Sequence, residues 1–482
     1  MRELALLALL VGTPAAAETQ PGASPPSAAA GTGTESWQAP TLTITRYDEH
    51  WEDLADPSAR TGHWTEPFKY IPIGANAYLT TGIELLAHGE SYHDNLWGSA
   101  PAPDDSYVWL RAMPYADLHA GRGVIGVRGF VQPILAYAVG VRPSAGPIDQ
   151  TRTDLLQGFA DVRIGAETGS TEAPGLTVRG GRQMISLGTE RLVGTRYGPN
   201  VPLAFDGTRI LVSLPGANVT LLAVRPVQPG TGTLDDRRSR NKELHAVYAT
   251  IPKIGIASGL DVYWLGYRNT AARYGGVTGI ERRDSYGARL FGSSAGWHWN
   301  VEAVYQGGQF AGQRISAWTI GSETGRALPS LPFSPDAILR ISVVSGDRRS
   351  GDGRLGTFNA LFPKGKYFGE LSPVGPYNII SANPRLALSL SRKLSASIAG
   401  MAYWRYTKGD GIYDVPGNLI RAPGNATSRF IGKEVEATVA WQATPELELS
   451  GSLSAFAPGG FIHQTGSAQT ITMLGFETNF RF

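Results

Sequence analysis

The sequence contains no cysteine, few charged residues and no long apolar run beyond its first residues. The absence of cysteine excludes thiolate metal sites, disulfide bridges and cysteine nucleophiles. Charged residues make up 17% of the chain and the formal net charge is +2, which argues against a polybasic nucleic-acid binder and an acidic disordered tail. After residue 17 no run of about 18 apolar residues occurs, so the sequence offers no helical membrane span. A membrane location would therefore require a β-barrel.

Glycine and aromatic residues, in contrast, are plentiful. The chain has 60 glycines, 11 tryptophans, 19 tyrosines and 16 phenylalanines among its 482 residues. This composition is typical of many strands joined by tight turns, with aromatic side chains placed at membrane interfaces. We therefore expect one large all-β unit instead of two or three soluble domains.

The amino terminus predicts export from the cytoplasm. Arg2, the apolar run Leu4 to Val11 and the small residues Ala15 to Ala17 have the order of a signal peptide over residues 1–17. Residues 18–40 are rich in Ala, Pro, Gly, Ser and Thr and predict a flexible low-complexity leader. Residues 41–76 show no periodicity and are interpreted as a periplasmic segment that leads into a barrel over residues 77–482.

Two-residue alternation is the main structural signal of the sequence. Apolar residues from Ala77 to Ala87 alternate with mostly polar ones, and the stretch from Tyr107 to His119 repeats the pattern. Alternation over a dozen residues exceeds an ordinary strand of roughly 5 to 6 residues and matches the roughly 10 residues that cross a membrane. The predicted fold is an all-β, transmembrane antiparallel β-barrel of about 18 strands with a polar lumen. The expected strands are 77–90, 105–119, 122–139, 154–168, 175–187, 205–215, 217–226, 241–251, 258–269, 282–292, 297–308, 313–322, 336–346, 384–392, 395–407, 431–443, 446–456 and 470–482.

Connection lengths support the barrel independently. Barrels of this class place short turns on the periplasmic side, where both termini lie, and longer loops outside. Tight connections are expected at 120–121, 215–216, 252–255, 294–295, 393–394 and 444–445. Long loops are expected at 140–153, 188–204, 227–240, 270–281, 347–383, 408–430 and 457–469, and 323–335 is an exception that is long on the periplasmic side. The last strand alternates up to a terminal Phe482, as outer-membrane barrels commonly do.

The polar face of each strand defines the expected lumen. The basic residues on that face are Arg111, Arg128, Arg163, Arg179, Arg209, Arg289, Arg340 and Arg405. Guanidinium groups stay charged and bind carboxylates in a bidentate manner, which favours an anionic solute. The acidic residues on the same face are Glu84, Asp117, Asp161, Glu302, Glu434, Glu436 and Glu448. These acids either brace the wall by pairing with the arginines or keep each cationic site weak, so that a solute can leave, and both explanations stay open.

Motifs for other chemistry are weak. The spacing of Gly121, Gly123 and Gly126 matches a dinucleotide fingerprint, but it precedes a strand where the fingerprint needs a helix. The loop with Asp347 and Asp352 could hold a cation, although a polar turn explains it better because the closing glutamate of an EF-hand is missing. We found no zinc spacing, nucleophile elbow or P-loop. The sequence predicts a protein that is not an enzyme and has no cofactor.

Several stretches resemble the alginate-export family of outer-membrane proteins. They are Arg46 to Pro57 with Phe68 to Gly74, Gly181 to Gly188 with Arg191 to Gly194 and Phe205 to Arg209, Ser345 to Pro363, and Ile431 to Phe461. The resemblance implies a monomeric 18-stranded barrel whose arginine-rich pore lets the polyuronate alginate diffuse outward, gated by a loop on each side. It also places Arg179, Arg182, Arg191 and Arg209 in matching motifs. Arg182, however, lies on the apolar parity of its strand.

The leading hypothesis is therefore a passive outer-membrane channel for an anionic, alginate-like polysaccharide. The alternatives are a porin for small anionic solutes, a barrel hydrolase, for which no Ser, His and acid set is evident, and a purely adhesive barrel. The expected partners are the polysaccharide, outer-membrane lipid and periplasmic secretion proteins, with no nucleic acid.

Overall fold

The computed structural model describes residues 40, 42–121 and 123–482. The predicted signal peptide and all but residue 40 of the predicted leader lie outside the described residues. Within the described part no helix has the length and apolar character needed to cross a membrane.

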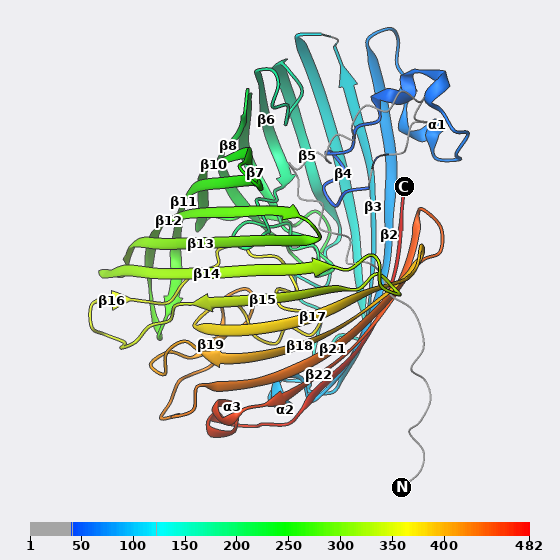
Figure 1. The fold of residues 1–482 in the computed structure, drawn as a ribbon. Coiled ribbons are helices and arrows are strands. Elements are labelled where there is room, and N and C mark those ends of the chain that lie inside the picture. The colour runs from blue at the N-terminus through cyan, green and yellow to red at the C-terminus, as the bar shows by residue number, and fades with distance from the viewer. Residues whose placement is uncertain (1–39, 41, 122) are drawn as a thin grey trace, which may run out of the picture.

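The fold is a closed antiparallel β-barrel (Figure 1). Each wall strand pairs with its neighbours along the chain, and the last strand pairs with the first through the register Glu84 to Arg481. Closure satisfies the backbone donors and acceptors at both sheet edges, which a strand in lipid requires. The 18 wall strands are β2 (Ala77–His93), β3 (Asp105–Ala120), β4 (Ile125–Val139), β5 (Arg152–Gly165), β6 (Gly175–Met184), β7 (Ala204–Leu214), β8 (Ala217–Gln228), β10 (Lys242–Ile254), β11 (Ala257–Tyr274), β12 (Val277–Ser294), β13 (Trp297–Phe310), β14 (Gln313–Ala327), β15 (Asp336–Val344), β17 (Ile379–Ser391), β18 (Leu394–Arg405), β21 (Phe430–Gln442), β22 (Leu447–Pro458) and β23 (Ile471–Arg481).

The predicted 18-stranded barrel is confirmed, and the alternation sorts side chains as expected. On β3 the side chains of Val108 and Leu110 are 42% and 45% exposed on the outer wall, whereas Arg111 is 3% exposed. The same contrast recurs around the barrel, because every second residue points to the opposite face of the sheet. The outer wall is therefore apolar and the inner wall polar.

One predicted loop is wrong. Residues 270–281 do not form a long loop, because β11 runs to Tyr274 and β12 begins at Val277. The connection is a two-residue hairpin at Gly275 and Gly276, with φ angles of 54° and 80°. A type I′ hairpin needs positive φ at both central positions, which two consecutive glycines adopt without strain.

The two ends of the barrel differ. We call the end where β2 begins and β23 ends the terminal rim, and the opposite end the loop rim. Most connections at the terminal rim are short, and 166–174 and 328–335 are longer. The loop rim carries the long connections, with shorter ones at 275–276 and 311–312. The remaining elements are η1 (Glu52–Ala55), η2 (Pro57–Ala59), α1 (Glu66–Lys69) and β1 (Ile71–Pro72) before the barrel, and α2 (Asn95–Gly98), β9 (Arg237–Arg238), β16 (Arg354–Leu355), β19 (Ile412–Tyr413), β20 (Leu419–Arg421) and α3 (Gly460–Thr465) in the loops.

The N-terminal segment, residues 42–76, packs into the terminal end of the barrel. Tyr47 is 2% exposed and contacts the rings of Phe130 and Phe159 from the inner wall. Its hydroxyl donates to the carbonyl oxygen of Met184 at 2.7 Å. Helix α1 lies beside the C-terminus, whereas α2 and α3 lie at the opposite rim (Figure 1).

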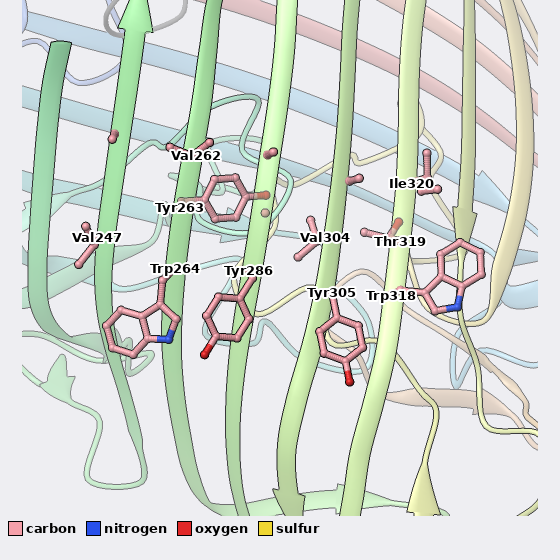
Figure 2. Close-up of a pocket in the computed structure, with 14 residues that line it drawn as sticks. Val247, Val262, Tyr263, Trp264, Tyr286, Val304, Tyr305, Trp318, Thr319 and Ile320 are labelled. Atoms are coloured by element: carbon pink, nitrogen blue, oxygen red, sulfur yellow. The ribbon is translucent and has the colours of Figure 1, made fainter.

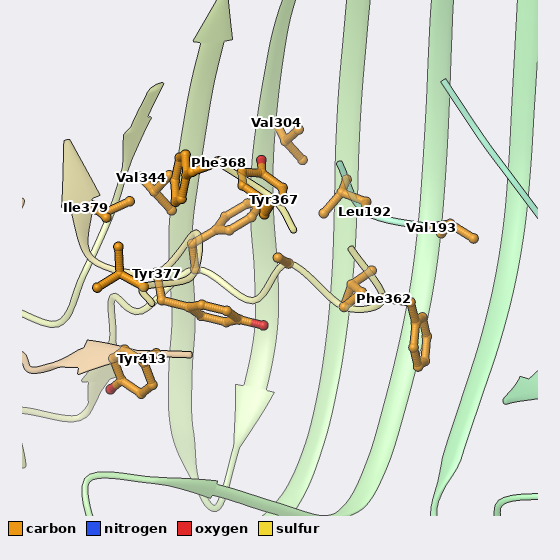
Figure 3. Packing of buried hydrophobic residues seen from close by; sticks show 14 of the residues in the cluster. Leu192, Val193, Val304, Val344, Phe362, Tyr367, Phe368, Tyr377, Ile379 and Tyr413 are labelled. Carbon is orange, nitrogen blue, oxygen red and sulfur yellow. The ribbon is translucent and has the colours of Figure 1, made fainter. Parts of the chain in front are cut away.

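Two loops, which we call the inner loops, fold inward from the loop rim. The β6–β7 loop (185–203) and the β15–β17 loop (345–378) meet in a parallel bridge between Val193 and Phe362. The amide of Phe362 donates to the carbonyl of Leu192 at 2.9 Å, and the amide of Gly194 donates to the carbonyl of Phe362 at 2.8 Å. Figure 3 shows their apolar side chains gathered against the wall strands. The buried aromatic core of this protein thus lies inside the barrel, where these loops cross it.

Candidate functional site

A polar cavity opens inside the barrel at the terminal rim. It has a volume of about 590 Å³ and lies between the N-terminal segment and the inner wall. We call this cavity the terminal vestibule. Four predicted arginines from four consecutive strands line it: Arg128 of β4, Arg163 of β5, Arg179 of β6 and Arg209 of β7. The alternation therefore brings half of the predicted basic residues together in one chamber.

Two of these arginines are held by carboxylates on the neighbouring strand. Arg128 binds Asp117 through Nε at 2.8 Å and Nη2 at 2.5 Å. Arg179 binds Asp161 in the same bidentate manner at 2.8 and 2.9 Å, and its guanidinium lies 4.2 Å from the centre of the Tyr47 ring. Bidentate pairs fix geometry as well as charge. Arg128 and Arg179 therefore brace the wall and seat the N-terminal segment.

The other two arginines of the vestibule are held more weakly. Arg163 pairs with Glu167 at 2.9 Å, but the Glu167 side chain is 60% exposed, so water and salt screen the pair. Arg209 contacts the Tyr47 hydroxyl at 3.5 Å. No carboxylate within the described residues lies within 4.0 Å of its guanidinium. Arg163 and Arg209 are thus the cations of the vestibule that an anionic solute could engage.

Lys69 of α1 is a buried cation beside the vestibule. Its ammonium donates to the Tyr115 hydroxyl at 2.8 Å and to the carbonyl of Thr81 at 3.0 Å, and it lies 5.0 Å from the centre of the Trp51 ring. Burial lowers the pKa of Lys69 to about 7. The anchoring of the N-terminal segment therefore involves a group that titrates near neutrality.

Two further inward arginines, Arg111 of β3 and Arg289 of β12, bind carboxylates of the wall, and Arg111 also binds the β6–β7 loop. Arg111 pairs with Glu84 at 2.9 Å and donates to the carbonyl oxygens of Pro199 and Asn200 at 3.1 and 3.2 Å. Arg289 donates from Nε to Asp261 at 2.6 Å. These two predicted residues do face the interior, but the wall and the β6–β7 loop satisfy them.

A cationic pair on the loops themselves was not predicted as lumenal from the strand pattern. Arg191 of the β6–β7 loop binds Glu302 of β13 at 2.9 Å and Tyr367 of the β15–β17 loop at 2.9 Å. Lys366 pairs with Glu370 at 2.6 Å and with Glu90 of β2 at 3.2 Å. Strand parity cannot assign loop residues, and the family motif was the signal that marked Arg191. These contacts fasten both inner loops to the wall.

Arginines also face the interior on the wall beyond β14. Arg340 pairs with Glu323 of the adjacent strand. Arg385, two residues along β17 from Asn383, has no hydrogen-bonded partner within the described part of the chain, and its Nε atom is buried. Arg385 was missed, although its alternation with Pro384, Leu386 and Leu388 was available as a signal.

Arg405 and Glu434, which were also predicted to line the pore, contact the loops and the wall. Arg405 is fully buried, and its guanidinium donates to the carbonyl oxygens of Lys408, Asp410, Ala426 and Ser428 in the β18–β21 loop. Glu434 accepts a hydrogen bond from the Tyr403 hydroxyl at 3.2 Å. Both side chains therefore hold loops and wall together.

Arg182, which the family motif marked, faces the outer wall. It binds Asp206 at 2.8 and 3.2 Å near the loop rim. Its orientation thus follows the alternation in β6, which puts residue 182 on the apolar face, although the family motif marked it as a possible lumenal residue.

Solved structures with a similar barrel fold include an outer membrane protein and a porin. The barrel is similar to the Pseudomonas aeruginosa protein OccK2 (OpdF) in complex with glucuronate, with a TM-score of 0.53, 10% identity, and coverage of 86% of this chain and 99% of that one. It is also similar to P. aeruginosa OpdO, with a TM-score of 0.55, 12% identity, and coverage of 84% of this chain and 97% of that one. A BenF-like porin from P. fluorescens Pf-5 is similar with a TM-score of 0.55, 10% identity, and coverage of 84% of this chain and 98% of that one. These identities are low, so the similarity shows the fold.

Comparison by sequence is more specific than comparison by structure. A search among curated proteins finds no match. The family model described as alginate export matches residues 77–475, which is most of the chain and nearly the whole barrel. Fold and family together make this protein an outer-membrane channel. The chain therefore belongs to the alginate export family.

Proposed function

We propose that this barrel is a passive export channel for an anionic polysaccharide of the alginate type, a polyuronate. The observation that carries the proposal is the terminal vestibule, where Arg163 and Arg209 line a polar cavity and lack a strong carboxylate partner. A polyuronate presents one carboxylate on each sugar ring, and guanidinium binds carboxylates in a bidentate manner. The family to which the chain belongs supports the same substrate class.

The proposed direction follows from the asymmetry of the barrel. We place the terminal rim in the periplasm, because both ends of a barrel of this class lie there. A polymer arriving from the periplasm would then meet the vestibule first. Further along the lumen it would meet Arg191 and Lys366, which hold the inner loops through carboxylates. These loops serve as the outer gate in the proposed mechanism, and the N-terminal segment with Tyr47 serves as the inner one.

A porin for small anions is the second candidate, and two observations favour it. A cavity of about 590 Å³ is large enough for a single sugar acid, and a polymer could pass only if the N-terminal segment and, further along the lumen, the inner loops moved. The similar porin OccK2 was solved in complex with glucuronate, a uronate monomer. The two candidates therefore differ in whether the inner loops open for a chain of sugars.

The test is a planar-bilayer recording on the full-length mature barrel. We expect the wild type to prefer anions, and oligouronate added at the terminal side to interrupt the current. The double variant Arg163→Gln with Arg209→Gln should lower the anion-to-cation permeability ratio by roughly five-fold for each charge removed, since a unit charge a few ångströms away contributes about 1 kcal/mol in water. The oligouronate block should weaken with it.

The matched control is Arg326→Gln, which removes one guanidinium from the exposed terminal end of β14, where Arg326 packs over the Trp297 ring. This variant should leave ion preference unchanged. If glucuronate passes through the channel while oligouronate neither passes nor blocks the current, the small-anion porin is favoured. Unchanged ion preference in the double variant would contradict both candidates.

A further inference from the structure

A row of four aromatic side chains crosses the outer wall on β11 to β14 (Figure 2). Cross-strand pairing joins Trp264 to Tyr286, Tyr286 to Tyr305 and Tyr305 to Trp318. Tyr286 and Tyr305 are 56% and 46% exposed. Tyrosine and tryptophan on the outside of a membrane barrel lie at the level of the lipid headgroups. The row therefore marks one edge of the membrane on this wall.

An apolar hollow of about 790 Å³ lies beside this row on the outer wall. Its floor is a second cross-strand row, two residues from the aromatic one, formed by Ala249, Val262, Ala288, Ala303 and Ile320. Three of these five side chains are alanine methyl groups, so the wall is recessed between the larger neighbours. The hollow is open and almost entirely apolar, which suits an acyl chain.

A row of arginines lies on the other side of the aromatic row, toward the loop rim. Four residues beyond the aromatic side chain of each strand stand Arg268, Arg282, Gln309 and Arg314, which are again direct cross-strand partners. Arg354 of β16 pairs with Arg314 and extends the row. Four residues of strand correspond to about 13 Å along the chain. The arginines therefore lie just beyond the headgroup level.

Like charges directly opposite each other are unfavourable in a sheet unless an anion lies between them. Arg268 and Arg282 are such a pair. Arg268 has one carboxylate nearby, Glu243 at 3.6 Å, and Glu243 also binds Arg225. Arg282 and Arg314 are exposed, and no carboxylate in the described part of the protein lies within 4.0 Å of either.

Other groups on this surface do not cancel the charge. Asp284 stands between the two rows and accepts a hydrogen bond from the Trp264 indole at 3.0 Å. Arg354 donates to the Ser316 hydroxyl at 2.8 Å. The patch formed by Arg268, Arg282, Arg314 and Arg354 thus carries more cationic than anionic groups, and it spans about 19 Å across the four interstrand spacings from β11 to β16.

We propose that this outer wall binds a glycolipid carrying more than one phosphate, with the phosphates on Arg268, Arg282, Arg314 and Arg354 and an acyl chain in the apolar hollow. The headgroup bridges several strands, which a lipid with a single phosphate cannot do over this width. Guanidinium groups bind phosphate oxygens in a bidentate manner, and the aromatic row fixes the depth of the headgroup. The site is independent of the lumen and of the transported solute.

The experiment is native mass spectrometry of the full-length mature barrel in detergent, titrated with a bisphosphorylated disaccharide lipid. We expect the triple variant Arg268→Gln, Arg282→Gln, Arg314→Gln to bind this lipid at least ten-fold more weakly. The control Arg326→Gln removes an outward charge from the far end of β14 and should bind within two-fold of wild type. Heat-modified gel migration verifies that each variant is folded.

A second arm changes the lipid and leaves the protein intact. The same lipid without phosphates, and phosphatidylglycerol with one phosphate, should each bind the wild type at least ten-fold more weakly than the bisphosphorylated form. Equal binding of the triple variant and wild type would overturn the proposed arginine site. Equal binding of the dephosphorylated lipid would overturn the phosphate recognition, and equal binding of phosphatidylglycerol would overturn the requirement for several phosphates.

Discussion

Replacing Arg191 by glutamine should release the two inner loops and raise the open probability of the channel. The Arg191 guanidinium joins three parts of the structure, because it binds Glu302 of β13 and Tyr367 of the β15–β17 loop while its own backbone belongs to the β6–β7 loop. The Arg191 side chain is 17% exposed and that of Glu302 is 5% exposed. Solvent therefore weakens this connection little.

The magnitude follows from the lost hydrogen bonds. A hydrogen bond to a charged group contributes about 1.5 to 3 kcal/mol. Glu302 would keep the hydrogen bond from the Tyr263 hydroxyl, so its carboxylate would not be left without a donor. We therefore assign about 3 kcal/mol to the connection, which corresponds to roughly a 150-fold larger population of displaced loops.

The assay is single-channel recording of wild type, Arg191→Gln and Arg191→Lys under identical salt. We expect longer and more frequent openings in the glutamine variant, and an intermediate effect for lysine, which keeps the charge and loses the fork geometry. Arg326→Gln is the control for loss of one positive charge outside the lumen. If Arg191→Gln folds and conducts with wild-type open probability, the loops are not held by this contact and the reasoning is refuted.

Three further outcomes are expected. The pKa of Lys69 is about 7 when the N-terminal segment is packed in the barrel and near 10.5 when the segment is released, so the released state binds more protons between these values. Protection of residues 42–76 from hydrogen exchange should therefore increase as pH rises from about 7 to 10.5, and this pH dependence should be lost in Lys69→Met. Gly308→Ala should lower the free energy of unfolding by about 1 to 3 kcal/mol in urea titrations, because φ is 132° and a Cβ would lie 2.1 Å from the carbonyl oxygen of Arg282. Trp97→Ala should lower it by about 3 to 5 kcal/mol in the same titrations, because the ring is fully buried against Phe456.

The barrel could be predicted from sequence because lipid and water impose opposite preferences on neighbouring residues. That pattern ends where the lipid ends, while the hydrogen-bonded ladder continues. On β11 the outward side chains change from Val262 and Trp264 to Arg268, and pairing with β12 persists to Tyr274. The predicted end at residue 269 therefore marks the edge of the apolar zone and not the end of the strand, which is why residues 270–281 were mistaken for a loop.

The site was predictable in orientation and not in pairing. The two-residue alternation predicted that Arg128, Arg179 and Arg209 face inward. It could not show that carboxylates hold the first two while the third has no such partner. Contacts of the inner loops were less accessible still. Arg191 meets partners 111 and 176 residues away, and nothing local in the sequence encodes where a long loop crosses the lumen.

The pairing itself suits the proposed transport. If eight inward guanidinium groups were all free, and each contributed about 1.5 kcal/mol to a carboxylate polymer, the total would approach 12 kcal/mol, which is nanomolar binding. Such a channel would retain its polymer. With Arg128 and Arg179 occupied by aspartates, and Arg163 and Arg209 exchanging with water or with an exposed glutamate, about 3 kcal/mol remains in the vestibule. Binding at or weaker than millimolar lets a solute enter and leave, so the acids of the lumen support conduction as directly as the arginines do.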